Sequence, residues 1–134
     1  MIRDASVLDL LKGKNSLLDS RLIGVLVGRD ASGVNVELQF RARPDSDFSE
    51  IRMNFTGVIE YEIAYEEAEE YIDIWDLKFL KLVDGSFYIT LDPDPSTLPA
   101  AGATVVQQSD TDNLFVRGRH IEAFVTQAEL KPGR

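Results

Sequence analysis

A chain of 134 residues has the usual size of one domain, so we expect residues 1–134 to fold as a single unit. Its 44% of hydrophobic and 28% of charged residues are close to globular averages, which argues against a disordered or fibrous chain. The chain has no cysteine, which excludes disulfides, thiolate metal sites and cysteine nucleophiles.

The net charge of −9 is concentrated in one region of the sequence. Eight acidic residues and no basic one lie between Glu60 and Asp76. Such a segment repels phosphate backbones and anionic membranes, so we expect neither a nucleic acid nor a membrane partner. It attracts a basic protein, or it serves as a solvated face that aids solubility.

The first residues, MIRDASVLDLLKGKN, contain acidic side chains and no apolar run typical of a signal peptide. No stretch of the sequence approaches the ~20 apolar residues that span a bilayer. We therefore expect a soluble protein of a reducing, cytoplasmic compartment.

The first predicted element is a short helix from Asp4 to Lys12. Asp4 is placed to cap its first turn, Val7, Leu8 and Leu11 form one apolar stripe, and Gly13 follows its last residue.

A series of strands follows the helix. The apolar run from Ser20 to Val27 predicts a strand covered on both faces. Between Gly33 and Arg43 apolar and polar residues alternate, which predicts a half-buried strand. Alternation from Ile51 to Tyr65 predicts a long strand bent at Gly57, with Ile51, Met53, Phe55, Ile59, Tyr61, Ile63 and Tyr65 facing inward.

The second half of the chain is also β-like. The segment from Tyr71 to Val83 predicts a strand with a bulge near Asp76, and Asp84-Gly85 predicts a two-residue hairpin turn leading into a strand from Ser86 to Asp92. The last strand, from Asn113 to Thr126, changes phase and predicts a bulge at Gly118.

About six or seven strands in sequence, without a βαβ pattern, predict a mainly β fold with a short N-terminal helix. The strands form either an antiparallel β-sandwich or a partly open barrel.

No constellation of catalytic residues is present. His120 is the only histidine, which excludes multi-histidine metal sites, and no serine lies in a GxSxG motif. On a strand, a lone histidine is typical of a surface or structural position. We therefore expect no enzymatic activity and no cofactor.

Four aspartates flank the proline-rich loop that begins at Asp92: Asp92, Asp94, Asp110 and Asp112. Their oxygens suit calcium, which takes six to eight oxygen ligands. DPD and DTD are also typical turn and cap sequences. The alternative function is a small-ligand or calcium-binding β-domain with its site at the loop from Asp92 to Asp112, which we call the aspartate loop.

Two arginine clusters are candidate anion sites, one at Arg41 and Arg43 and the other at Arg117, Arg119 and His120. Because carboxylates are in excess, pairing of these arginines within the chain is the favoured interpretation.

Aromatic residues lie within the acidic segment, and tyrosine and tryptophan beside charged groups are typical of binding hot spots. Large aromatics in β-proteins are also commonly part of the core. The candidate binding residues are Glu66, Glu67, Glu69, Glu70, Tyr71, Asp73 and Trp75. They predict a non-enzymatic domain that uses an acidic and aromatic face to bind a basic protein.

The segment LKLVDGSFYITLD, followed by Pro93 and later by Ser109-Asp110-Thr111-Asp112-Asn113, resembles small uncharacterised bacterial all-β domains. Some of these resemble immunity proteins encoded beside secreted toxins. The resemblance covers roughly a third of the chain. It implies an all-β fold, a bacterial origin and an immunity-like role, and it carries no catalytic residues.

Overall fold

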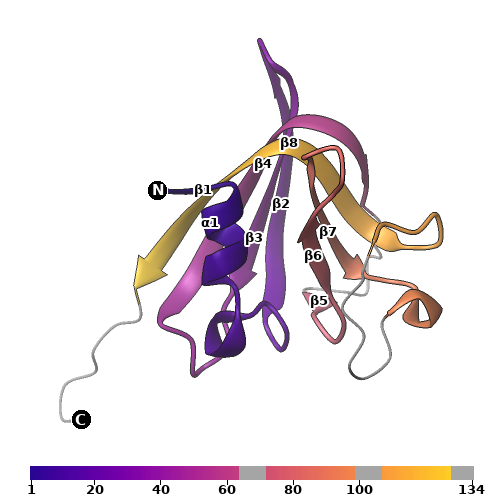
Figure 1. Ribbon diagram of the computed structural model, residues 1–134. Coiled ribbons are helices and arrows are strands. Elements are labelled where there is room, and N and C mark those ends of the chain that lie inside the picture. Colours follow the sequence, from indigo (N-terminus) through magenta and orange to yellow (C-terminus); the bar gives the residue numbers. More distant parts are fainter. Residues whose placement is uncertain (64–71, 99–106, 128–134) are drawn as a thin grey trace, which may run out of the picture.

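The computed structural model describes residues 1–63, 72–98 and 107–127. The described chain is an antiparallel sheet of eight strands with one short α-helix near the N-terminus (Figure 1). The elements in chain order are β1 (Ile2–Arg3), α1 (Ala5–Leu10), β2 (Arg21–Asp30), β3 (Gly33–Arg41), β4 (Phe48–Glu62), β5 (Ile72–Asp73), β6 (Lys78–Lys81), β7 (Phe87–Asp92) and β8 (Asn113–Gln127), with short 3₁₀ helices at Gly13–Asn15 and Pro95–Thr97.

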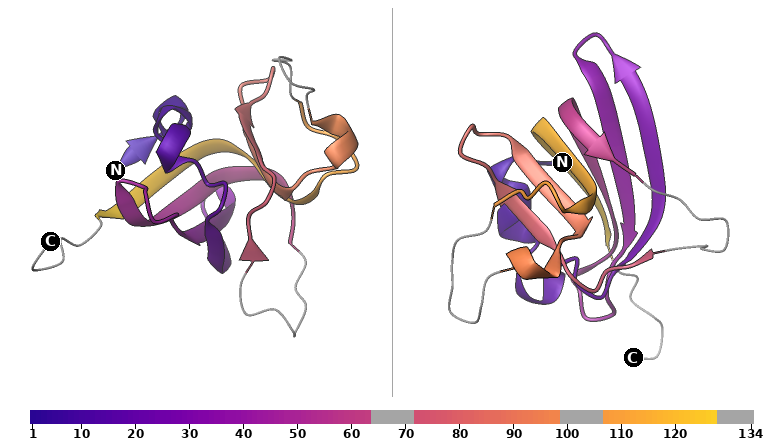
Figure 2. Two further views of the ribbon diagram at one scale, coloured as in Figure 1. Left: turned by 90° about the horizontal axis from the view of Figure 1, so that it is seen from below. Right: turned by 90° about the vertical axis from the view of Figure 1, so that its right-hand side faces the viewer.

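The strands form one sheet in the order β5-β2-β3-β4-β8-β7-β6, and β1 adds to β8. The sheet curls into a half-barrel, as the two views in Figure 2 show. The predicted mainly β fold and N-terminal helix are confirmed, and of the two predicted architectures the partly open barrel is the one observed.

The core lies against the concave face of this sheet. Leu38, Met53 and Ala123 are directly opposite one another on β3, β4 and β8, and all are buried. Directly opposite residues share a face, so such rows build a continuous apolar surface. Val7 of α1 and Leu17 complete the same core. The alternation predicted for β3 is confirmed, because Val36, Leu38 and Phe40 are all buried.

The long strand β4 bends after Phe55. Gly57 has a φ of 57°, and the register with β8 shifts between Val58 and Glu60. One extra residue reverses the side-chain alternation that follows it. The prediction that Ile59 and Tyr61 face inward is therefore wrong: 41% and 44% of their surfaces are exposed.

Gly118 lies on β8, opposite this bend. A Cβ atom there would be 3.2 Å from the carbonyl oxygen of Thr56 and 3.3 Å from the Cβ of Phe55. The glycine thus permits a close approach of β8 to β4. The bulge predicted at Gly118 in β8 is wrong, because the extra residue lies in β4, between Val58 and Glu60.

The prediction of one strand from Tyr71 to Val83 is wrong. In the described residues of this segment, β5 pairs with β2 and β6 pairs with β7, so the two strands lie at opposite edges of the curled sheet. The residues from Ile74 to Leu77 connect the two edges.

The hairpin predicted at Asp84-Gly85 is confirmed, with a loop one residue longer than expected. The N–H of Leu82 donates to the carbonyl of Ser86 at 2.8 Å, which leaves Val83, Asp84 and Gly85 as the loop. Gly85 has a φ of 88°, a conformation in which an L-residue is strained.

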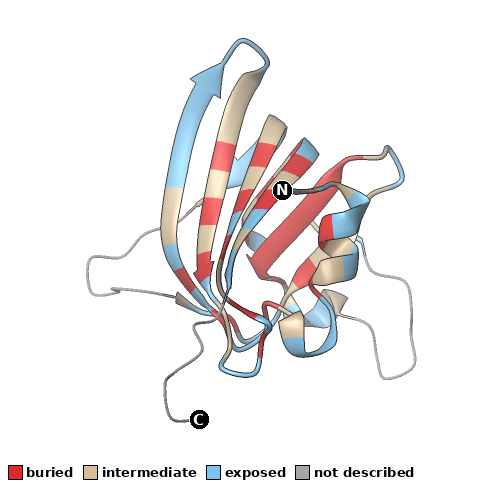
Figure 3. Cartoon of the chain, turned by 90° about the vertical axis from the view of Figure 1, so that its left-hand side faces the viewer, coloured by how far each residue is buried: buried red, intermediate tan, exposed pale blue. Residues whose placement is uncertain are grey.

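Strand β2 is not covered on both faces, contrary to expectation. Its outer half is exposed, with 61% of Leu26 and 51% of Val27 accessible, and it forms the outer strand of the sheet in Figure 3. Apolar composition alone does not reveal that a strand lies at an edge.

Asp4 precedes α1, but its side chain does not cap the helix. Its carboxylate accepts a hydrogen bond from the N–H of Ile121 at 2.9 Å and lies 3.3 Å from Nδ1 of His120. The residue thus connects the N-terminal segment to β8.

In the described ranges, no helix is long and apolar enough to cross a membrane.

Candidate functional site

Trp75 is the most conspicuous exposed side chain of the acidic segment, with 79% of its surface accessible. It follows Ile74, which is 1% exposed and belongs to the core. Because successive side chains of an extended segment point to opposite sides, burial of Ile74 turns Asp73 and Trp75 outward.

The backbone that carries Trp75 is held in place by a neighbouring segment. The N–H of Asp19 donates to the carbonyl of Ile74 at 2.9 Å, and the N–H of Ile74 donates to the carbonyl of Ser20 at 3.0 Å. Asp19 adopts a φ of 64°. These bonds bring Asp19 beside a segment that is distant in the sequence.

A shallow depression of about 220 Å³ lies next to Trp75. It is lined by Asp19, Arg21, Asp73, Ile74 and Trp75. Nε of Arg21 lies 2.9 Å from a carboxylate oxygen of Asp73, and both side chains remain more than two-fifths exposed.

We name Asp19, Asp73, Trp75 and the exposed Asp76 the acidic–tryptophan surface. Asp19 and Asp73 line the depression together with the indole ring, and Asp76 follows Trp75 in the sequence. Carboxylates near an indole ring suit a cationic side chain, which the carboxylates attract and the ring face stabilises. Arg21 is the basic residue at its edge.

The structure brings together only part of the predicted binding set. Asp73 and Trp75 lie on this surface, while Glu66, Glu67, Glu69, Glu70 and Tyr71 lie outside the described residues. Asp19 was missed in the sequence analysis, and no local pattern marks it, because its position depends on backbone pairing with Ile74.

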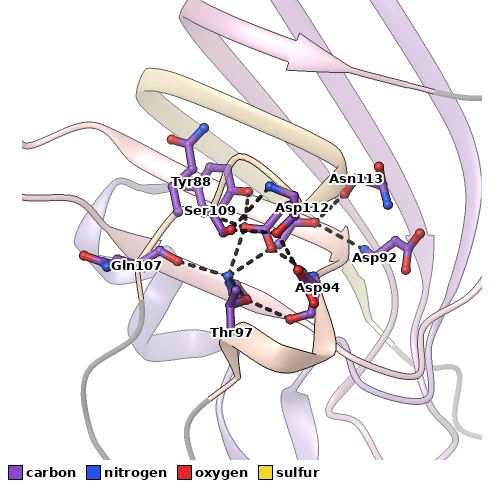
Figure 4. Close-up of polar contacts among 12 residues, drawn as sticks. Tyr88, Asp92, Asp94, Thr97, Gln107, Ser109, Asp112 and Asn113 are labelled. Carbon is purple, nitrogen blue, oxygen red and sulfur yellow. Dashed lines mark hydrogen bonds and ion pairs between the residues drawn. The ribbon is translucent and has the colours of Figure 1, made fainter.

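The aspartate loop contains a second polar cluster, centred on Asp112 (Figure 4). The side chains of Asp112 and Lys78 are both 0% exposed, and Nζ of Lys78 lies 2.9 Å from Oδ2 and 3.0 Å from Oδ1 of Asp112. Lys78 on β6 thus supplies a positive charge inside the protein.

Three further donors reach the carboxylate of Asp112. The hydroxyl of Tyr88 donates at 2.7 Å, and the backbone N–H groups of Asp94 and Ser109 donate at 3.0 Å each. Burial by itself raises the pKa of Asp112, but these donors and Lys78 outweigh it, so its pKa lies below the usual value. Burial, and then the bond to Asp112, raise the pKa of Tyr88.

Lys78 also donates to Oγ1 of Thr97 at 2.7 Å and to the carbonyl of Gln107 at 3.0 Å. The cluster therefore links β6 and β7 to the residues on both sides of the loop. Lys78 and Asp112 neutralise each other, and neighbouring residues supply their other hydrogen bonds. Such an arrangement is typical of a buried ion pair with a structural role.

The four aspartates do not form a cation cage. Asp112 is paired with Lys78, and Asp94 accepts from the N–H of Ser96 at 2.9 Å at the start of the 3₁₀ helix Pro95–Thr97. Among the described residues, no group of three or more potential ligands is arranged to hold a metal ion. The turn and cap role is thus the one observed for Asp94.

One arginine of each cluster pairs with carboxylates of the chain, as the favoured interpretation predicted, and Arg119 donates to the carbonyl of Gly57. Arg117 bonds to Asp84 and lies 3.6 Å from Glu60, and Nε of Arg43 lies 2.8 Å from Asp45. Strand β4 separates β3 from β8, so Arg41 and Arg117 do not lie on neighbouring strands.

The fold and its surface thus define an antiparallel half-barrel that presents an exposed tryptophan among carboxylates. Comparison with protein-family models, with curated proteins and with solved structures finds no match to this chain.

Proposed function

We propose that this protein is a non-enzymatic binding domain that engages a basic protein through the acidic–tryptophan surface. The observation that carries the proposal is the exposure of Trp75, 79% of whose surface is accessible between Asp73 and Asp76. A large aromatic side chain left in water gains free energy when a partner covers it, and tryptophan is enriched among binding hot spots.

Charge supports the same partner class. The sequence carries a net charge of −9, and Glu66, Glu67, Glu69 and Glu70 extend the acidic segment next to Tyr71. Complementary charge accelerates association with a basic partner, and burial of the aromatic ring supplies affinity.

The pairing of the buried charged groups and of the single histidine supports a binding role over catalysis. Lys78 and Asp112 are engaged with each other, and His120 faces Asp4 near the surface. Together with the sequence resemblance, these features lead us to propose a cytoplasmic bacterial protein of the immunity type. Its partner would be a basic protein such as a toxin.

We do not extend the proposal to a cation at the aspartate loop. The carboxylate of Asp112 already accepts five hydrogen bonds, two of them from Lys78.

The test uses a lysine-rich peptide without aromatic residues as the probe. Trp75 is the only tryptophan, so its fluorescence reports directly on occupancy of the surface. We expect salt-sensitive binding that is lost in Trp75→Ala, measured by calorimetry, and weakened in Asp73→Asn/Asp76→Asn. Neutralising Glu66, Glu67, Glu69 and Glu70 together tests the rest of the segment.

Val83→Ala is the matched control, because Val83 is fully exposed on the β6–β7 hairpin. Equal affinity of the wild type, Trp75→Ala and the two neutralised variants for the peptide would show that the acidic–tryptophan surface is not the binding site.

A further inference from the structure

Among the described strands, only β5 pairs with the outer edge of β2, and it covers a small part of its length. Strand β5 pairs only with Arg21 and Leu22, and the register of β2 with β3 shifts immediately afterwards, between Leu22 and Gly24. Within the described ranges, no strand pairs with the outer edge of β2 from Gly24 to Asp30.

The register identifies the backbone groups on that edge. Asp30 and Gly33 are opposite each other across a two-residue turn, so they form a hydrogen-bonded pair. Bonded and non-bonded pairs alternate along an antiparallel ladder. The N–H and C=O groups of Val25, Val27 and Arg29 therefore point away from β3, toward the open edge.

The side chains along this edge are apolar and exposed. The exposed fractions are 61% for Leu26, 51% for Val27 and 39% for Ile23. No charged residue or proline occurs between Leu22 and Gly28, although charges and prolines are common means of protecting an edge strand from pairing. Among the described residues, nothing lies within 4 Å of where a Cβ at Gly28 would stand, so the face of β2 is uncovered there as well.

We propose that this edge pairs with β2 of a second copy of the chain, antiparallel and about a two-fold axis. Such a pair joins the two half-barrels into one continuous sheet. The proposal is independent of the acidic–tryptophan surface.

Charge does not oppose a second copy at this place. Each copy has a net charge of −9 that is concentrated around the acidic segment, so two copies repel each other where those segments approach. The β2–β3 hairpin is different, because Arg21, Arg29 and Arg41 outnumber Asp30 and Glu37. Two copies can therefore meet along this edge without the repulsion that the acidic region produces.

The pattern of residues selects one register. With Leu26 opposite Leu26 of the second copy, Val25 faces Val27, and Gly24 faces Gly28. The outward groups of Val25 and Val27 then form the hydrogen-bonded pairs. A register centred on Val25 places Arg29 opposite Arg21 of the second copy, and one centred on Val27 places Leu26 opposite Gly28. In neither register are the two Leu26 side chains opposite each other.

The first experiment uses the absence of cysteine from the chain. In the proposed register residue 26 opposes itself in a non-hydrogen-bonded pair, with Cα atoms about 4.5 Å apart, a separation that a disulfide spans. We expect Leu26→Cys to oxidise rapidly to a disulfide-linked dimer. Val83→Cys lies on another hairpin at a position even more exposed than Leu26, and it should oxidise slowly.

The second experiment is sedimentation of the full chain over micromolar to millimolar concentrations. Val27→Pro removes an outward N–H and leaves the β2–β3 hydrogen bonds intact, while Leu26→Lys places a charge at the two-fold axis. We expect each to raise the dimer dissociation constant by about tenfold or more, and Trp75→Ala to leave it unchanged. Leu26→Lys serves as the test if Val27→Pro does not fold.

A wild type that stays monomeric over this range would overturn the proposal. So would a dimer that is insensitive to Leu26→Lys, or equal oxidation rates for the two cysteine variants. Binding of β2 to a strand of a different protein, with no self-association, would also replace the second copy as its partner.

Discussion

The ammonium of Lys78 lies 2.9 Å from the carboxylate of Asp112, and neither side chain is exposed to solvent. The pair joins two residues that are 34 positions apart in the sequence. Removing one member of such a pair leaves the other charge buried without compensation, which costs far more than losing a surface ion pair.

Lys78→Met keeps a side chain of similar length and removes the charge. We expect the free energy of unfolding to fall by about 3–5 kcal/mol, measured by urea denaturation. Lys81→Met, on the exposed end of the same strand, should change it by less than about 1 kcal/mol. Equal effects of the two substitutions would show that the buried pair is not the source of stability.

Asp112 also predicts a pH dependence. Its hydrogen bonds and Lys78 hold its pKa below the usual value despite burial. The stability it contributes is therefore present above a pH of about 4, where the unfolded carboxyl ionises, and is lost as the pH falls through the lower folded-state pKa. The difference in unfolding free energy between the wild type and Asp112→Asn should accordingly shrink on acidification.

Asp110→Asn, which alters an exposed carboxylate of the same loop, is the matched control and should follow the wild-type pH profile. A constant difference between the wild type and Asp112→Asn down to acidic pH would contradict the linkage.

The acidic–tryptophan surface predicts that cationic and anionic quenchers reduce the fluorescence of Trp75 to different extents. Carboxylates at Asp19, Asp73 and Asp76 concentrate cations and repel anions near Trp75. Relative to a free tryptophan amide at equal ionic strength, its fluorescence should therefore be quenched more by caesium and less by iodide. The difference should narrow in Asp73→Asn/Asp76→Asn and at high salt. Quenching by iodide that exceeds that of the free amide would show that Arg21 dominates the local potential.

Gly85→Ala should destabilise the β6–β7 hairpin. Its φ of 88° places an L-residue in a conformation that costs roughly 1–2 kcal/mol, measured as a loss of unfolding free energy. Gly28→Ala is the comparison, because Gly28 lies in extended β2 with open space around it. If both variants lose the same stability, backbone strain is not the cause.

Features that depend on short stretches of sequence were predicted correctly. The alternation of Val36, Leu38 and Phe40 located the buried face of β3, and Asp84-Gly85 located a hairpin. Side-chain alternation and turn preferences act between neighbouring residues, so a single sequence displays them directly.

Predictions failed where the outcome depended on distant residues. Ile59 and Tyr61 turned outward because the bulge in β4 forms against β8. Likewise, Leu26 and Val27 lie on an outer strand because pairing with β5 ends at Leu22.

The sequence by itself determined the β class, the N-terminal helix and the concentration of acidic residues around Trp75. The tertiary structure decided that Asp112 meets Lys78, that Asp19 lies beside Trp75 and that, among the described strands, only the short β5 pairs with the outer edge of β2. Local conformational preferences depend on residues that are adjacent in the sequence. Burial, ion pairing and strand order instead arise from contacts between segments that only the folded chain brings together.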